Sequence, residues 1–185
     1  MDKYILMSRD GVINVRQDDP ITQVEQLVLL PYVQESCLHL EQLGWKAIIL
    51  VNEPALANGV MDQSVLKDIH ARMYELISEG GGRVTDVMVC PSAYAPWDKC
   101  AFPKAGLLQL AAYKHALDLP TVYFVGDCLE CLQAAWTVGC KSGLVRSGNP
   151  YKTLQYLRTS DRVPDLLTND LLSMVYRITG SPPSP

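Results

Sequence analysis

Two aspartates, Asp10 and Asp127, are the residues best placed for chemistry, because each follows directly on a short apolar run. Asp10 lies in the segment Ser8-Arg9-Asp10-Gly11, and Asp127 follows Val125-Gly126. Carboxylates at the ends of buried strands can serve as general acid or base, and carboxylate oxygens are ligands that Mg²⁺ prefers. A structural interpretation stays open, in which Asp10 orders its loop and Asp127 caps the next helix.

Cysteine is the second residue type that could carry chemistry. The chain has six cysteines, but their spacing is not that of a small secreted disulfide scaffold, so we expect reduced thiols. Cys128 and Cys131 form a Cys-x-x-Cys pair at the start of an expected helix, where the helix dipole would lower a thiol pKa. Two interpretations of these residues stay open. They could be a reactive pair or a pair that binds a soft metal, or they could have drifted in a loop that no longer serves catalysis.

The composition is that of a globular protein. The chain has 185 residues, 48% hydrophobic and 19% charged, which predicts one domain over residues 1–180 and a disordered tail at 181–185. The net charge of -4 argues against nucleic acid as a partner. No apolar stretch approaches the roughly 20 residues of a membrane span, and the N-terminus lacks a signal-peptide pattern. We therefore expect no membrane association and a cytoplasmic location.

Short apolar runs alternate with amphipathic stretches along the chain. The runs are near-continuous, as expected of strands covered on both faces: 4–7, 47–51, 84–89, 122–125 and 143–145. Helical spacing predicts helices over 33–43, 65–76, 107–115 and 132–136, and a last helix capped by Asn169 or Asp170. This alternation predicts a three-layer α/β fold with a mostly parallel sheet of five or six strands and helices on both faces.

The candidate site lies beyond the carboxyl ends of the expected strands, where open parallel sheets bind ligands. The segments that follow the runs are 8–11, 52–54, 90–92, 126–128 and 146–148. Polar and cationic side chains in or near these segments are candidates for binding a small anionic ligand, namely Arg9, Asn52, Lys104 and Arg146. The three histidines lie inside helical patterns, away from the strand ends, and are expected to be surface or packing residues: His39, His70 and His115.

The ordered motifs resemble those of a known family. The segment 8–14 is similar to the first motif of the haloacid dehalogenase (HAD) superfamily, and 125–127 with 132–135 is similar to its last motif. The segments between them look like those of the D-glycero-D-manno-heptose 1,7-bisphosphate phosphatases and the related histidinol-phosphatase domain: Leu50-Val51-Asn52 with Gly59, Cys90-Pro91, Pro103 with Gly106, and 144–148. The resemblance covers residues 3–178 and implies a Rossmann-like HAD fold.

The resemblance also implies a magnesium-dependent phosphatase in which a carboxylate attacks phosphorus and water then hydrolyses the aspartyl-phosphate. Ser8 stands at the position of that nucleophile, whereas Asp10 keeps the position of the general acid and base. Asp127 keeps a magnesium position, but the second acidic position near the metal is Cys131, a soft ligand.

Further motif positions depart from the family pattern. The phosphate-binding hydroxyl corresponds to Val51, and the cationic pair corresponds to Ala101-Phe102, with Lys104 nearby. The family's zinc loop, Cys-x-His then Cys-x-Cys, corresponds to Cys90-Pro91-Ser92 and Asp98-Lys99-Cys100. Two thiols, Cys90 and Cys100, remain where tetrahedral zinc needs four ligands, so we do not expect zinc.

These departures favour a catalytically impaired phosphatase homologue with a binding or regulatory role, for a sugar phosphate, another small anion or a protein partner. A rim loop carrying Tyr94, Pro96 and Trp97 is a candidate contact for such a ligand or partner. Two alternatives remain. The first is an active sugar-phosphate phosphatase that uses Asp10 to activate water, with Asp127 on a metal. The second is a thiol-based protein that responds to metal or redox state.

Overall fold

The computed structural model describes residues 2–92, 98–148 and 150–181 of the chain. The aromatic rim loop at Tyr94, Pro96 and Trp97 and the tail from residue 182 onward lie outside the described residues.

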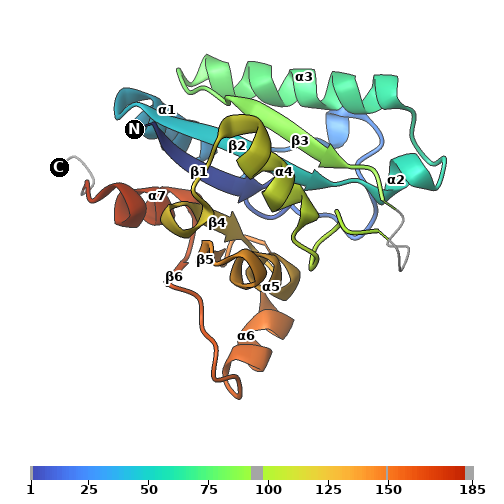
Figure 1. Ribbon diagram of the computed structural model, residues 1–185. Helices are drawn as coiled ribbons and strands as arrows, with labels where there is room; N and C mark the ends of the chain where they lie inside the picture. The colour runs from blue at the N-terminus through green and yellow to red at the C-terminus, as the bar shows by residue number, and fades with distance from the viewer. Residues whose placement is uncertain (1, 93–97, 149, 182–185) are drawn as a thin grey trace.

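A single six-stranded sheet forms the centre of the described structure, in the order β3-β2-β1-β4-β5-β6 (Figure 1). Every pairing in it is parallel. The strands are β1 (Lys3–Ser8), β2 (Trp45–Asn52), β3 (Asp86–Cys90), β4 (Tyr123–Gly126), β5 (Lys141–Val145) and β6 (Leu166–Thr168). The predicted three-layer α/β fold is thus confirmed, and the parallel register places the carboxyl ends of all strands along one edge.

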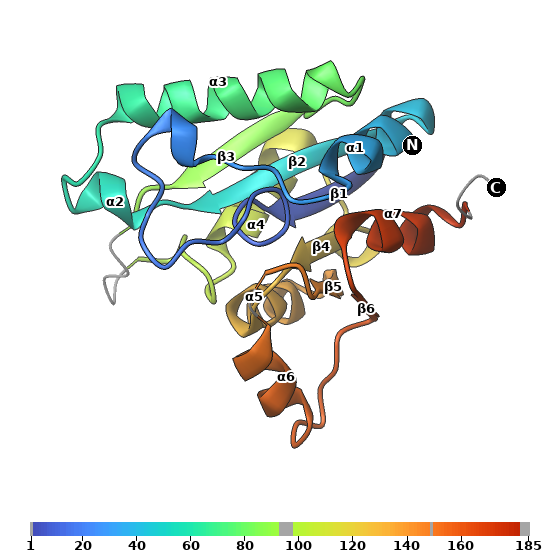
Figure 2. The same ribbon diagram turned by 180° about the vertical axis from the view of Figure 1, so that it is seen from behind.

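Helices cover both faces of this sheet (Figures 1 and 2). On one face lie α1 (Val33–Gln42), α3 (Gln63–Glu79) and α7 (Leu171–Thr179), and on the other lie α4 (Gly106–His115) and α5 (Leu129–Val138). The shorter helices are α2 (Pro54–Ala57) and α6 (Tyr151–Leu157), with single 3-10 turns at η1 (Val24–Gln26) and η2 (Leu119–Thr121).

Alternation along the strands divides the core into two clusters. In β1, Ile5 and Met7 face the α1, α3 and α7 layer, whereas Leu6 faces α4 and α5. In β2, Ile49 and Ile48 point to opposite sides in the same way. Successive side chains of a strand alternate between its faces, so a continuous apolar run supplies both layers at once.

Local sequence sets the start of α7. Asp170 caps α7, since its carboxylate accepts a hydrogen bond of 2.7 Å from the backbone N–H of Ser173, as predicted. Asp62 occupies the N-cap position of α3, but its side chain makes no capping hydrogen bond. Across the described ranges, no helix has the length and apolar character needed to cross a membrane.

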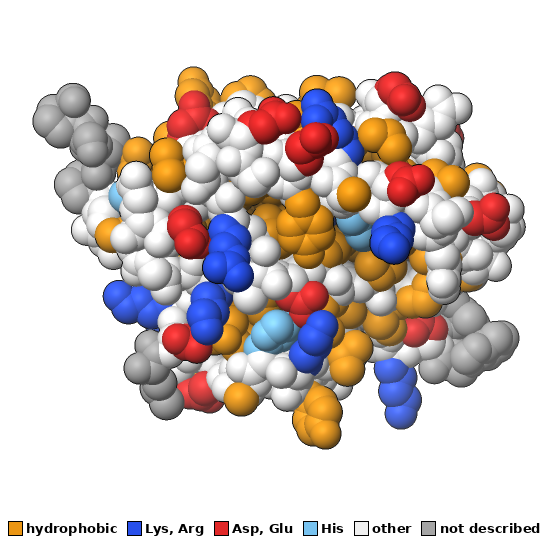
Figure 3. Space-filling view, turned by 90° about the horizontal axis from the view of Figure 1, so that it is seen from above, with side chains coloured by type: hydrophobic (Ala, Val, Ile, Leu, Met, Phe, Trp, Pro, Cys, Tyr) orange, Lys and Arg blue, Asp and Glu red, His pale blue; other side chains and the backbone are white. Residues whose placement is uncertain are grey.

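The outer flank of β3 bears an apolar hollow beside α3. A cavity of about 660 Å³ there has apolar walls, with Leu66, Tyr74, Val87 and Val89 among the lining residues. The space-filling view in Figure 3 shows hydrophobic side chains gathered in a hollow with charged side chains around it.

Candidate functional site

A cavity of about 450 Å³ opens at the carboxyl ends of β1 and β2, between the loop after β1 and the start of α5. It brings together four of the predicted site residues, Ser8, Arg9, Asp10 and Asn52. The remaining residues of its lining are Arg16, Leu50, Val51, Phe102, Pro103, Cys128, Glu130 and Cys131. This is the position that the parallel topology predicts for a ligand site.

Ser8, the last residue of β1, borders this cavity but is nearly inaccessible, at 6% exposure. Its Oγ is a buried atom without a hydrogen-bond partner among the described residues. A serine hydroxyl needs an adjacent base to become a nucleophile. The geometry around Ser8 therefore does not activate it.

Arg9 borders the cavity, but it is only 2% exposed and its guanidinium lies in a buried polar network. Its Nη2 donates to Oε2 of Glu53 at 2.9 Å and to Oδ2 of Asp10 at 3.0 Å, and its Nε donates to Oδ1 of Asp10 at 3.1 Å. Asn14 also donates to Oδ1 of Asp10, at 3.0 Å. Both oxygens of the predicted acid and base, Asp10, thus already accept hydrogen bonds. Burial raises the pKa of Glu53, although Arg9 acts in the opposite direction.

His70 of α3 completes this network on its far side. Its Nε2 lies 3.4 Å from Nη1 of Arg9. Burial lowers the pKa of His70 to about 4, and the positive charge of Arg9 contributes to that lowering. The ring is therefore neutral at physiological pH, so that Nε2 can accept a hydrogen bond from the guanidinium. The prediction left open whether His70 lies at the surface or packs, and the structure shows a buried ring that contacts Arg9, the residue after β1.

Asp127, the residue after β4, is completely buried. Two glycines from other loops close around its carboxylate: a Cβ added at Gly11 or at Gly148 would lie 2.0 Å from Oδ2 of Asp127. Ser147 joins these loops, because its Oγ donates to the carbonyl of Gly11 at 2.9 Å. The carboxylate sits in a backbone cradle that no larger residue at either position would allow.

The guanidinium of Arg16 pairs with the carboxylate of Asp127 on a side that the two glycines leave open. Its Nε donates to Oδ2 of Asp127 at 2.5 Å, and its Nη2 donates to Oδ1 at 2.6 Å. The same Nη2 lies 3.3 Å from the backbone carbonyl of Asp10. Hydrogen bonding to Asp127 raises the pKa of Arg16, which stays charged. Sequence reasoning missed Arg16, since it lies in the segment between β1 and α1 and its partner is 111 residues away.

Cys128 and Cys131 lie at the start of α5 with their Sγ atoms 3.4 Å apart. The hydrogen bond between the two thiols raises the pKa of Cys131 well above its usual value, and burial adds to the effect. The prediction that the helix dipole lowers a thiol pKa here is therefore wrong for Cys131. Its environment favours the neutral thiol over the thiolate.

With Arg16 in place, the donors around Asp127 do not fit a magnesium ion. Magnesium takes hard oxygen ligands in near-octahedral geometry. Here both oxygens of Asp127 are paired with Arg16, Ser8 offers only a hydroxyl, and Cys131 offers a soft sulfur.

The other predicted ligand-binding residues lie differently. Asn52, at the end of β2, lines the cavity, and its Oδ1 accepts a hydrogen bond of 3.3 Å from the backbone N–H of Phe102. Lys104 donates to the backbone carbonyl of Asp98. Arg146 is exposed and follows β5. Among the described residues that line the cavity, neither Lys104 nor Arg146 is present.

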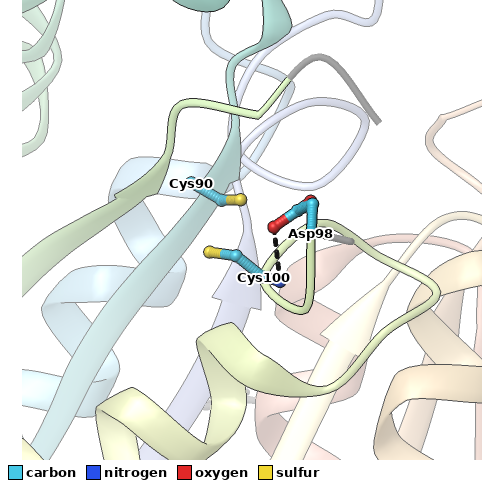
Figure 4. A group of neighbouring side chains, drawn as sticks. All are labelled: Cys90, Asp98 and Cys100. Carbon is cyan, nitrogen blue, oxygen red and sulfur yellow. Dashed lines mark hydrogen bonds between the residues drawn. The ribbon is translucent and has the colours of Figure 1, made fainter. Parts of the chain in front are cut away.

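A second cluster, formed by Cys90, Asp98 and Cys100, lies where the resemblance implies a zinc loop. The two thiols face each other with the Asp98 carboxylate beside them (Figure 4). Asp98 accepts backbone hydrogen bonds of 2.8 Å from Cys100 and 3.1 Å from Ala101, so it orders the turn. Within the described ranges this cluster has three candidate ligands, and tetrahedral zinc needs four. These residues do not fit a zinc ion. Burial raises the pKa of both thiols.

The sheet is fully parallel, and an aspartate lies in the loop after β1 and another in the loop after β4. The resemblance of this sequence's motifs to those of HAD-like phosphatases predicted this architecture. Comparison with known proteins agrees with this class. A HAD-like phosphatase from Mesorhizobium loti superposes with a TM-score of 0.75 over 96% of this chain and 87% of that chain, at 24% identity, which shows the fold alone. No family model matches the chain.

Two heptose phosphatases are more similar. The D-glycero-beta-D-manno-heptose-1,7-bisphosphate 7-phosphatase of Pseudomonas aeruginosa is 35% identical over 150 residues, 81% of this chain and 84% of the relative. The D,D-heptose 1,7-bisphosphate phosphatase of B. bronchiseptica, complexed with magnesium and phosphate, has a TM-score of 0.90 and 29% identity, covering 97% of this chain and 99% of that chain. The chain therefore belongs to the heptose bisphosphate phosphatase family of the HAD superfamily.

Proposed function

We propose that this chain is a catalytically impaired member of its family, whose cavity binds a ligand without hydrolysing it efficiently. The observation that carries the proposal is Ser8, at the position of the nucleophilic carboxylate, with a buried Oγ that has no hydrogen-bond partner among the described residues. Loss of a nucleophile alone commonly lowers the rate by about 10⁴–10⁶. That loss corresponds to roughly 5–8 kcal/mol of activation barrier.

The walls of the cavity support the same proposal. Val51 lies where the resemblance implies a phosphate-binding hydroxyl, and its methyl groups cannot donate a hydrogen bond. Phe102 lies where it implies a cation, so an apolar side chain stands in the lining instead of a positive charge. Glu130 adds a negative charge to the lining. Together these changes remove electrostatic stabilisation of a phosphoryl group.

The alternative of an altered, active mechanism depends on Asp10. Its side chain is 29% exposed and reaches the cavity, which would allow contact with water. However, its two oxygens accept hydrogen bonds from Arg9 and Asn14, and the neighbouring Ser8 hydroxyl is neither a carboxylate nor activated. We therefore expect Asp10 to order its loop and to contribute no efficient turnover.

The test is phosphate release by the purified protein with magnesium. The panel contains heptose 1,7-bisphosphate, the substrate named for the relatives, together with histidinol phosphate and an aryl phosphate. The same compounds are titrated by calorimetry to measure binding. A Ser8→Asp, Cys131→Asp variant is run in parallel, because it returns carboxylates to two motif positions. Ser64→Asp, which adds a carboxylate at an exposed position of α3, is the matched control.

We expect no turnover by the natural chain or by Ser64→Asp. Activity gained by Ser8→Asp, Cys131→Asp would show that the cavity still accepts a phosphate ester. Turnover by the natural chain at ordinary enzyme rates, lost in Asp10→Ala, would overturn the proposal in favour of an altered phosphatase mechanism.

A further inference from the structure

We propose that Arg16 takes the place of a bound divalent cation, so that its guanidinium is the permanent counter-ion of Asp127. The inference concerns how this site satisfies its buried charge, and it goes beyond the proposed function because it does not depend on which ligand the cavity binds.

The first step is that the buried carboxylate of Asp127 needs a positive charge beside it. The residue is fully buried, and an isolated carboxylate without a partner is very costly inside a protein. The backbone cradle of Gly11 and Gly148 lies against Oδ2 and leaves no room for another side chain on those sides. Among the described residues, the counter-ion of the carboxylate comes from a side that these glycines leave open, and Arg16 fills that side.

The second step is the geometry of the guanidinium. Nε and Nη2 of Arg16 donate to different oxygens of Asp127, at 2.5 and 2.6 Å, which is the two-point pairing typical of arginine and carboxylate. Nη2 also lies 3.3 Å from the carbonyl oxygen of Asp10. One positive group thus bridges oxygen ligands from the loops after β1 and β4. Oxygen atoms are also the ligands that hard divalent cations prefer, so the guanidinium occupies surroundings of a kind that such a cation could otherwise use.

The third step is the anchoring of Arg16 itself. The preceding residue, Val15, donates its backbone N–H to the carbonyl of Val28 at 2.8 Å. Its own carbonyl accepts a hydrogen bond of 3.0 Å from Nδ2 of Asn14. These contacts fix the backbone from which Arg16 extends, although the side chain itself is 39% exposed. The cation is therefore part of the chain and present at any metal concentration.

A divalent ion and Arg16 compete for the same carboxylate in this arrangement, so removing the guanidinium should create a dependence on metal. We compare thermal unfolding of the natural chain and Arg16→Met in chelator and in millimolar Mn²⁺, with Mn²⁺ binding followed by electron paramagnetic resonance. Arg83→Met, at an exposed position, is the control for loss of one arginine.

The natural chain and Arg83→Met should neither bind Mn²⁺ at this site nor change their unfolding midpoint. Arg16→Met should unfold roughly 5 °C or more lower in chelator. Mn²⁺ should bind this variant and restore at least half of the lost midpoint. The neutral pair Arg16→Met, Asp127→Asn should recover stability without metal and show no response to Mn²⁺.

Saturable Mn²⁺ binding by the natural chain that Asp127→Asn abolishes would overturn the proposal. It would also be overturned if Arg16→Met gained no Mn²⁺ binding. Should Arg16→Met fail to fold in chelator, the same comparison is made during refolding: recovery with Mn²⁺ supports the proposal, and no recovery overturns it.

Discussion

Nε2 of His70 lies 3.4 Å from Nη1 of Arg9, so a neutral imidazole faces a guanidinium inside the protein. Protonating the ring would place two positive charges side by side in a buried network. The negative charges of that network, Glu53 and Asp10, are already paired with Arg9. The charge state of His70 is therefore linked to the stability of the loops that form the cavity.

The first prediction concerns pH. The pKa of His70 is lowered from 6.5 to about 4 in the folded protein, so the unfolded chain binds more protons between those values. Stability should consequently fall as pH falls through this window, by at most about 1.4 kcal/mol per pH unit. His70→Gln, whose amide oxygen can still accept from Arg9, should flatten this slope. Urea unfolding at a series of pH values measures it.

The control for that experiment is His39→Gln. The ring of His39 packs edge-on against Tyr176, at 5.0 Å between centroids, and among the described residues it pairs with no charged side chain. The His39→Gln variant should therefore leave the change of unfolding free energy with pH the same as in the natural chain. Equal slopes for the natural chain and His70→Gln would contradict the prediction.

The second prediction concerns Glu53, which is 2% exposed and pairs with Arg9 at 2.9 Å. Glu53→Gln removes one of the two carboxylates that compensate the buried guanidinium. It should lower the free energy of unfolding by about 1–3 kcal/mol. Glu79→Gln, which alters an exposed ion pair with Arg72, should change it by less than about 0.5 kcal/mol. Denaturant unfolding measures both free energies. Equal losses in Glu53→Gln and Glu79→Gln would contradict the buried charge network.

The third prediction concerns the cradle of Asp127. A Cβ at Gly148 would come within 2.0 Å of Oδ2, so Gly148→Ala should displace the carboxylate and weaken its pairing with Arg16. We expect a loss of about 1–3 kcal/mol in unfolding free energy. Gly139→Ala is the comparison, because its surroundings are open and only its φ of 74° is unfavourable for alanine. It should cost about 1 kcal/mol. A Gly148→Ala protein as stable as the natural chain would mean that the cradle is not tight.

The fourth prediction concerns the thiols. Cys128 lines the cavity, whereas Cys37 and Cys140 are buried, and burial raises the pKa of each of these two to about 12. Alkylation followed by mass spectrometry should therefore label Cys128 well before Cys37 or Cys140. With a thiol oxidant, the 3.4 Å separation of Cys128 and Cys131 should allow a disulfide between them. Uniform labelling and no such disulfide would exclude the thiol-based alternative.

The elements that sequence predicted are those with a strong, continuous signal. The apolar runs of β1 and β2 are buried on both faces, and α7 begins at a capping aspartate. The missed elements are short or weakly buried. β6 has three residues, and Thr153 is the one buried residue of α6. Such segments are fixed by their neighbours in space rather than by their own pattern.

The site was predictable where a motif follows a strand and unpredictable where it depends on contacts across the fold. Ser8, Asp10, Asn52 and Cys131 were found in this way and meet in one cavity. The roles of Arg16 and Gly148 depend on Asp127, which lies on another loop. The only hint of Arg16 in its own segment is that it is a single cation shortly before two aspartates, Asp18 and Asp19. This signal is weak.

The position of β3 at one end of the sheet affects how readily two molecules could pair strand to strand. In the described part of the chain β3 ends the sheet, and an open strand edge beside an apolar hollow is a template for self-association. Here the strand spans five residues, is followed by Pro91, and begins at Asp86, which pairs with Lys114 and His115 of α4. A short edge with charge at one end and proline at the other disfavours edge-to-edge pairing between molecules, even though an apolar surface lies beside it.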